Sequence, residues 1–84
     1  MDKQHAQRVM QSIIKGRVKS LLDDGYTLSY KSALMTSVVY RLRHRSNGNV
    51  IIMHVYYQRN WLIQYTNGSC TYNNPIWSSY TPDA

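Results

Sequence analysis

The sequence predicts an α+β fold in which an N-terminal amphipathic helix packs on one face of a four-stranded antiparallel β-meander. The helix is indicated by apolar residues that recur at three- and four-residue steps between about residues 4 and 22. The meander is indicated from residue 37 onward, where β-branched and aromatic residues alternate with polar ones between turn-forming segments. A chain of 84 residues is expected to form a single domain, residues 1–84, with a thin core.

The predicted helix has one apolar stripe and one basic side. The stripe comprises Met10, Ile13, Ile14, Val18, Leu21 and Leu22, and the other side carries Lys3, Arg8, Lys15 and Lys19. Gly25 is expected to end the helix, because glycine readily adopts the left-handed conformation that follows a last helical turn. Gly16 lowers the helix propensity and is expected to mark a close approach to the sheet.

The segment after the helix is ambiguous. Leu28 and Tyr30 alternate as in a strand, whereas residues 32–35 could form a helical turn. We therefore expect a connector over residues 26–36, the meander over about 37–73 and a C-terminal tail over 74–84. Trp77 is expected to anchor the tail on the domain, and the alternative is an arm that inserts into a partner.

Three turns set the predicted register. The Asn-Gly pairs at residues 47–48 and 67–68 favour two-residue hairpin loops. These loops would pair Arg45 with Val50, Leu42 with Met53, Tyr65 with Cys70 and Ile63 with Tyr72. Between them, a three-residue loop over 58–60 is expected, with Asn60 in the left-handed conformation.

This register assigns alternate residues to two faces of the sheet. The core face would contain Val38, Tyr40, Leu42, His44, Ile51, Met53, Val55, Tyr57, Trp61, Ile63, Tyr65, Cys70 and Tyr72. The opposite face would contain Val39, Arg41, Arg43, Arg45, Val50, Ile52, His54, Tyr56, Leu62, Gln64, Thr66, Ser69 and Thr71. One helix can cover only one face, so apolar groups on the opposite face would stay exposed.

The charge distribution favours an anionic partner. The chain has ten lysine and arginine residues against four aspartates, and its formal net charge is +6. No acidic residue occurs between Gly25 and Pro82, a stretch that holds Lys31 and four arginines. The positive field of that stretch therefore has no internal partner to neutralise it.

The face opposite the core is the candidate binding surface. Its candidate residues, with one arginine from the middle loop, are Arg41, Arg43, Arg45, Ile52, His54, Tyr56, Arg59 and Leu62. Arginine interleaved with aromatic and aliphatic groups is typical of binding surfaces. The alternative is that the connector or the tail covers this face and the arginines reach solvent from its edge.

Nucleic acid or a nucleoprotein complex is the expected partner, because arginines can contact phosphates and Tyr56 can stack on a base. The alternative is an accessory protein of the kind found in phages and mobile elements, which inhibits or adapts a host complex by stoichiometric protein binding. Its partner would then be an acidic protein surface. A homodimer and a small anionic ligand such as a nucleotide are further candidates.

Catalysis, metal binding and cofactors are not expected. The acidic residues are confined to the helix end and the termini, so no carboxylate pair is available, and His54 beside Arg41 lacks a second acid or base. His5 and His44 lie on other elements without the spacing of metal ligands.

A cytoplasmic location without membrane association is expected. The single cysteine, Cys70, excludes an intramolecular disulfide. No run of about 20 apolar residues occurs, and residues 1–6 are too polar for a signal peptide.

Overall fold

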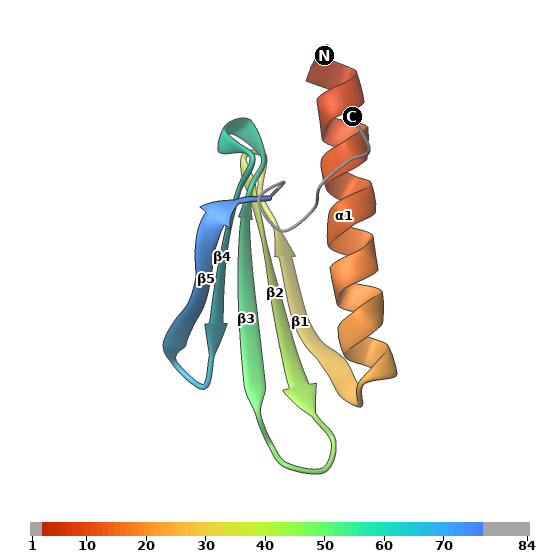
Figure 1. The fold of residues 1–84 in the computed structure, drawn as a ribbon, viewed down its shortest axis with the longest axis vertical. Coiled ribbons are helices and arrows are strands. Elements are labelled where there is room, and N and C mark those ends of the chain that lie inside the picture. The colour runs from red at the N-terminus through yellow and green to blue at the C-terminus, as the bar shows by residue number, and fades with distance from the viewer. Residues whose placement is uncertain (1–2, 77–84) are drawn as a thin grey trace.

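The structure is a computed structural model that describes residues 3–76. Its elements in chain order are α1 (Lys3–Asp23), β1 (Tyr26–Ala33), β2 (Ser37–His44), β3 (Val50–Tyr56), the 3-10 helix η1 (Tyr57–Arg59), β4 (Trp61–Thr66) and β5 (Ser69–Pro75). The five strands form one antiparallel sheet in the order β1-β2-β3-β4-β5. Helix α1 lies along one side of this sheet (Figure 1). The α+β class and the meander are confirmed, but the sheet has five strands and not four.

We call the side of the sheet that faces α1 the core face and the opposite side the outer face. The core cluster comprises Met10, Ile14, Tyr26, Leu42, Ile51, Met53, Val55, Leu62 and Ile76. Met10 and Ile14 come from the apolar stripe of α1, and the other members come from the core face and the chain after β5. Burial of these apolar groups is the main force that holds the helix on the sheet.

The end of α1 follows the prediction, whereas its middle does not. The Gly25 amide donates to the carbonyl of Leu22 over 3.2 Å, and Gly25 has a φ of 103°, so it ends the helix as expected. A Cβ atom added at Gly16 would meet nothing within 4 Å. The predicted close approach of Gly16 to the sheet is therefore wrong.

His44 connects the end of α1 to the end of β2. Its Nδ1 accepts the Ser46 amide over 3.2 Å, which leaves the proton on Nε2, and Nε2 donates to the Asp24 carbonyl over 2.9 Å. The imidazole also packs edge-on against the ring of Tyr26, with the ring centroids 4.8 Å apart. A Cβ atom at Gly25 would lie 2.7 Å from Nε2, so any larger residue there would have to displace the imidazole.

Strand β1 replaces the predicted connector. A bulge at Ser29 leaves this residue with no residue opposite it on β2, because Leu28 pairs with Leu42 and Tyr30 pairs with Arg41. Leu28 therefore faces the helix while Tyr30 faces outward, although the two are separated by one residue. The bulge breaks the period of two that marks a strand, which is why the sequence pattern was ambiguous here.

The β2–β3 loop is longer than predicted. Leu42 pairs with Ile51, whereas the two-residue loop would have paired it with Met53. The amide of Asn49 donates to the side chain of Asn47, and the amide of Arg45 donates to the carbonyl of Gly25. These bonds satisfy the amides of a wider turn. A shift of two residues changes the partners but not the faces, so the face assignment of β2 and β3 is confirmed.

The β3–β4 connection reverses the predicted faces of β4. Tyr56 pairs with Trp61, so four residues separate the strands instead of three. Asn60 is left-handed as predicted, with a φ of 51°, but Tyr57 belongs to η1 and not to β3. This one-residue difference turns every β4 side chain to the other face. Leu62 is consequently 0% exposed in the core, where the sequence had placed Trp61, Ile63 and Tyr65.

The last hairpin combines a correct turn with a second bulge. Tyr65 pairs with Cys70 as predicted, and Asn67 and Gly68 both have positive φ. Thr71 has no residue opposite it on β4, so the ring of Tyr72 turns to the core face opposite Gln64. Cys70 is exposed on the outer face, and its predicted place in the core is wrong. The expected anchor of the tail, Trp77, lies outside the described residues.

Candidate functional site

The outer face combines arginine with aromatic and aliphatic side chains. Its members, read from the strand pairing, are Thr27, Tyr30, Ser32, Ser37, Val39, Arg41, Arg43, Val50, Ile52, His54, Tyr56, Trp61, Ile63, Tyr65, Cys70, Asn73 and Pro75. Within residues 3–76, no helix or strand is packed on this side of the sheet (Figure 1). As far as the described residues are concerned, the face is therefore a platform whose apolar groups no other element covers.

Two arginines of the platform lie on β2, the second strand of the sheet. Arg41 is exposed on β2, with Tyr30 as its partner on β1 and Ile52 as its partner on β3. Arg43 lies one step along β2, opposite Val50. The backbones of neighbouring strands are about 4.8 Å apart, so each arginine lies beside at least one apolar side chain, Ile52 for Arg41 and Val50 for Arg43.

Four aromatic side chains lie on neighbouring positions of β3 and β4, and we call them the aromatic row: Trp61, Tyr56, His54 and Tyr65. The rings of His54 and Tyr56 are 6.3 Å apart between centroids and inclined by 30°. The rings of His54 and Tyr65 are 6.1 Å apart and inclined by 75°. Trp61 lies directly opposite Tyr56 across the two strands. All four side chains are partly exposed, so their π-surfaces are available for contact.

One end of the aromatic row borders a hollow of about 460 Å³, lined by Tyr56, Arg59, Trp61 and Ile63. The indole Nε1 of Trp61 donates to Oδ1 of Asn73 over 2.6 Å, which fixes the orientation of the ring. Arg59 is exposed and comes from η1. The hollow is therefore lined by two aromatic side chains, one aliphatic side chain and one cation.

Most of the predicted candidate residues reach the outer face. Arg41, Arg43, Ile52, His54 and Tyr56 lie there as expected. Arg59 lies in the β3–β4 connection as expected, beside the hollow, whereas Arg45 lies in the β2–β3 loop and Leu62 lies in the core. Leu62 therefore does not belong to the candidate surface, because the β3–β4 connection is one residue longer than predicted.

The aromatic half of the site was not predicted from the sequence. The expected three-residue loop over 58–60 placed Trp61, Ile63 and Tyr65 in the core. A contrary signal was present in α1, where Arg17 interrupts the apolar stripe between Ile13 and Leu21. A cation on the inner side of a helix needs a polar partner on the facing strand. Gln64 provides one, since the Arg17 guanidinium donates to its Oε1 over 3.0 Å.

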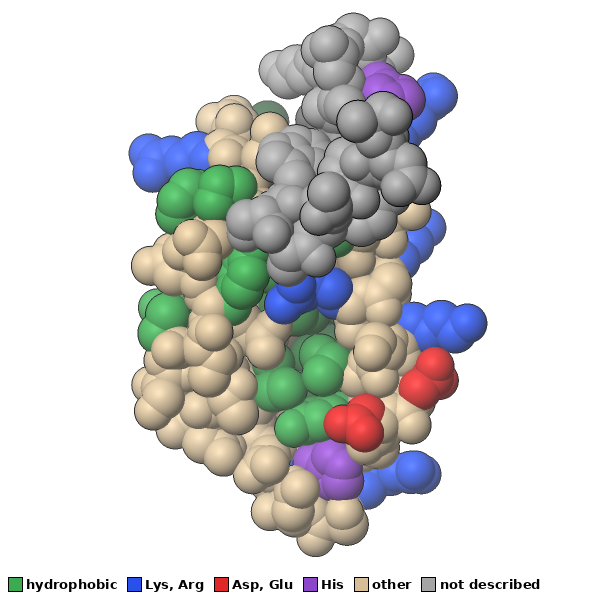
Figure 2. All heavy atoms as spheres, in the orientation of Figure 1, with side chains coloured by type: hydrophobic (Ala, Val, Ile, Leu, Met, Phe, Trp, Pro, Cys, Tyr) green, Lys and Arg blue, Asp and Glu red, His purple; other side chains and the backbone are tan. Residues whose placement is uncertain are grey.

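The described acidic side chains lie at the end of the helix and not on the sheet. Within residues 3–76, the acidic residues are Asp23 and Asp24, both at the end of α1. Figure 2 shows these two carboxylates together at that end, with basic side chains spaced along the outer side of the helix. No strand carries an acidic residue. The arginines of the outer face therefore have no carboxylate on the sheet to bind.

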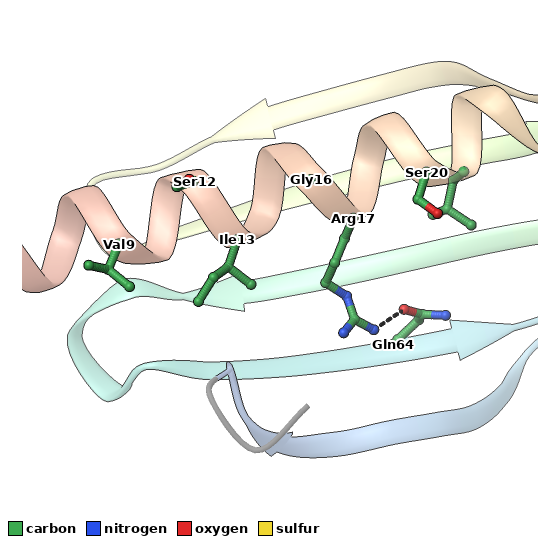
Figure 3. Close-up of a pocket in the computed structure, with 8 residues that line it drawn as sticks. Val9, Ser12, Ile13, Gly16, Arg17, Ser20 and Gln64 are labelled. Carbon is green, nitrogen blue, oxygen red and sulfur yellow. Dashed lines mark hydrogen bonds between the residues drawn. The ribbon is translucent and has the colours of Figure 1, made fainter. Parts of the chain in front are cut away.

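A second hollow lies on the core face, between α1 and β4. Its volume is about 580 Å³, and its lining residues are Val9, Ser12, Ile13, Gly16, Arg17, Ser20, Leu21 and Gln64. Figure 3 shows Arg17 extending from the helix across this groove to Gln64. The Arg17 guanidinium also lies 5.0 Å from the centroid of the Tyr72 ring. This groove is thus bridged by a contact that belongs to the helix–sheet packing.

Among the described residues, no three histidine, cysteine or acidic side chains are grouped as a metal would require. Within residues 3–76, Tyr40 is the titratable group whose pKa is clearly perturbed: burial on the core face, and then the neighbouring Tyr57, raise its pKa. Tyr40 also lies beneath Lys31, whose Nζ is 5.5 Å from the ring centroid. Neither feature lies on the outer face.

No helix within residues 3–76 is long and apolar enough to cross a membrane. Comparison of the chain with protein-family models, with curated proteins and with solved structures finds no match. We therefore infer the function from the geometry and chemistry of the outer face.

Proposed function

We propose that the protein binds single-stranded nucleic acid across the outer face, with phosphates on the arginines and bases on the aromatic row. The observation that carries this proposal is the placement of four aromatic side chains beside Arg41 and Arg43 on a sheet without carboxylates. Single-strand binders combine these two elements, a positive path for the backbone and aromatic platforms for successive bases.

The chemistry of the outer face favours a single strand over a duplex. In a duplex the base faces are stacked on one another, so a flat aromatic platform could reach only the phosphates and sugars. An unpaired base exposes its π-face, and stacking on an aromatic side chain contributes about 1–3 kcal/mol per base. From Val50 to Tyr56 the platform is about 20 Å long, at roughly 3.4 Å per residue.

Binding should be measured by fluorescence anisotropy with a labelled oligonucleotide, single-stranded and duplex, over a series of salt concentrations. Contacts from Arg41, Arg43, Arg45 and Arg59 to four phosphates predict a slope of log K against log salt of about −3. Duplex of the same sequence should bind more weakly, because the aromatic row then contributes little. A salt-independent affinity, or the absence of binding at low salt, would contradict the proposal.

A pair of matched charge reversals tests whether binding depends on the outer face or only on the net positive charge. The double variant Arg41→Glu/Arg43→Glu should weaken binding at least about tenfold, because two phosphate contacts are replaced by repulsion. The control Lys15→Glu/Lys19→Glu changes the net charge equally on exposed positions of α1. It should retain most of the affinity. Equal losses in the two variants would show that binding follows net charge and not this face.

A further inference from the structure

The geometry points to the hollow of Tyr56, Arg59, Trp61 and Ile63 as a subsite for one unpaired nucleobase, stacked on the indole of Trp61. This inference rests on the proposed function and adds where a base is held and by which residue. The volume of the hollow, about 460 Å³, lies within the usual range for small-molecule sites. Its walls are aromatic and aliphatic, which suits a planar heterocycle and not a phosphate alone.

Trp61 is fixed before any ligand arrives. Its Nε1–H is its single donor, and that donor is bonded to Asn73 across the β4–β5 pair. The indole therefore has no polar group left to satisfy, and its remaining contact capacity is the π-face. A side chain that is already ordered loses little conformational entropy on binding, so stacking on it is favoured. Asn73 acts here as a positioning residue.

Trp61 also differs from the rest of the aromatic row. The ring of His54 contacts both Tyr56 and Tyr65, so part of its surface is already used by neighbours. Among the described residues, Trp61 has no ring contact with another aromatic side chain. Its face is thus the largest aromatic surface of the row that is left for a base.

Arg59 supplies the charge that a nucleotide requires at the same place. It closes η1, whose last turn is set by the left-handed Asn60 and the bond from the Asn60 amide to the Tyr57 carbonyl. The short helix therefore holds Arg59 beside the stacking wall, where its guanidinium can bind the phosphate attached to the stacked base. Arg41 and Arg43 lie farther along the sheet and would contact the following phosphates.

The test compares an oligothymidylate of about twelve nucleotides with its abasic analogue, which keeps every phosphate and lacks every base. Trp61→Leu should weaken binding of the oligothymidylate about tenfold and leave binding of the abasic strand unchanged. Trp61→Phe keeps an aromatic face and should retain most of the affinity. Asn73→Ala should give a smaller loss of a few-fold, restricted to the strand with bases.

Tryptophan fluorescence gives an independent readout. The chain has two tryptophans, so a Trp77→Phe background leaves Trp61 as the sole source of indole emission. Stacking should quench this emission with the oligothymidylate and not with the abasic strand. Equal losses for both strands in Trp61→Leu, or unquenched emission on binding, would overturn the subsite while the proposed function stands. Failure of the unmodified protein to bind either strand would overturn both.

Discussion

The two faces of the sheet differ in chemistry although they alternate along the same strands. On β3, Ile51, Met53 and Val55 are buried beneath α1, while the residues between them face outward and are partly exposed. The core face is largely aliphatic, whereas the outer face combines arginine with aromatic rings. This difference shows that stability and the proposed binding are assigned to opposite sides of the sheet, so each can be altered with little effect on the other.

The comparison between the faces is tested most strongly by two adjacent residues of β4. Leu62 is 0% exposed in the core, whereas Ile63 faces outward. Leu62→Ala should lower the free energy of unfolding by about 3–4 kcal/mol, because it leaves a cavity. Ile63→Ala should cost about 1 kcal/mol or less, since its neighbours and solvent can adjust. Urea denaturation followed by circular dichroism measures both values.

The opposite ranking would contradict the structure. If Ile63→Ala were the more damaging change, β4 would have the orientation predicted from the sequence, with a three-residue connection before it. The aromatic row would then lie in the core and could not bind a base. This pair of variants therefore tests the fold and the site together.

The second prediction concerns the contact between the end of α1 and His44, which connects the helix to β2. Gly25→Ala should lower the free energy of unfolding by about 2 kcal/mol, since φ is 103° there and a Cβ would lie 2.7 Å from the His44 ring. Gly68→Ala is the matched control, because Gly68 also has a positive φ but has open space around it. It should cost about 1 kcal/mol, from backbone strain alone. Thermal denaturation of the two variants gives the comparison, and a cost at Gly25 no larger than at Gly68 would show that the contact with His44 is unimportant.

The smallest expected effect is a pH dependence that belongs to the core face. Burial raises the pKa of Tyr40 above its usual value of 10.0, so the folded chain keeps this proton at a pH where the unfolded chain loses it. The stabilisation is complete below about pH 10 and is lost as the pH rises through the higher pKa of the folded state. Tyr40→Phe should therefore show a smaller fall in melting temperature between pH 8 and pH 11. An equal fall in both proteins would contradict this assignment.

Several features of the fold could be predicted from the sequence because their signals are local. The apolar stripe defined α1, Gly25 defined its end, and Asn-Gly at 67–68 defined the last turn. The assignment of faces on β2 and β3 also held, although the register did not. An error of two residues in a loop preserves the faces, and this explains why five of the candidate site residues were placed correctly.

The failures share one physical origin, the gain or loss of a single residue in a strand or loop. The bulge at Ser29 concealed β1, and the extra residue before Trp61 reversed β4. The bulge at Thr71 changed the partner of Tyr72 from the predicted Ile63 to Gln64, so Tyr72 keeps its predicted core face although β4 is reversed. Hydrophobicity alone could not correct the second error, because Trp61, Ile63 and Tyr65 form a plausible core set. The choice depends on packing, in which Leu62 fits beneath α1 and Gln64 binds Arg17.

The two bulges lie on the two edge strands, β1 and β5. An edge strand offers unpaired amides and carbonyls, to which a strand of another molecule can add, and bulges, prolines and inward-pointing charges hinder such addition. Strand β1 has its bulge followed by the inward-pointing Lys31, and β5 has its bulge and ends at Pro75. Both edges of the sheet therefore hinder edge-to-edge polymerisation. A protein with an exposed apolar face can then stay unaggregated at a higher concentration.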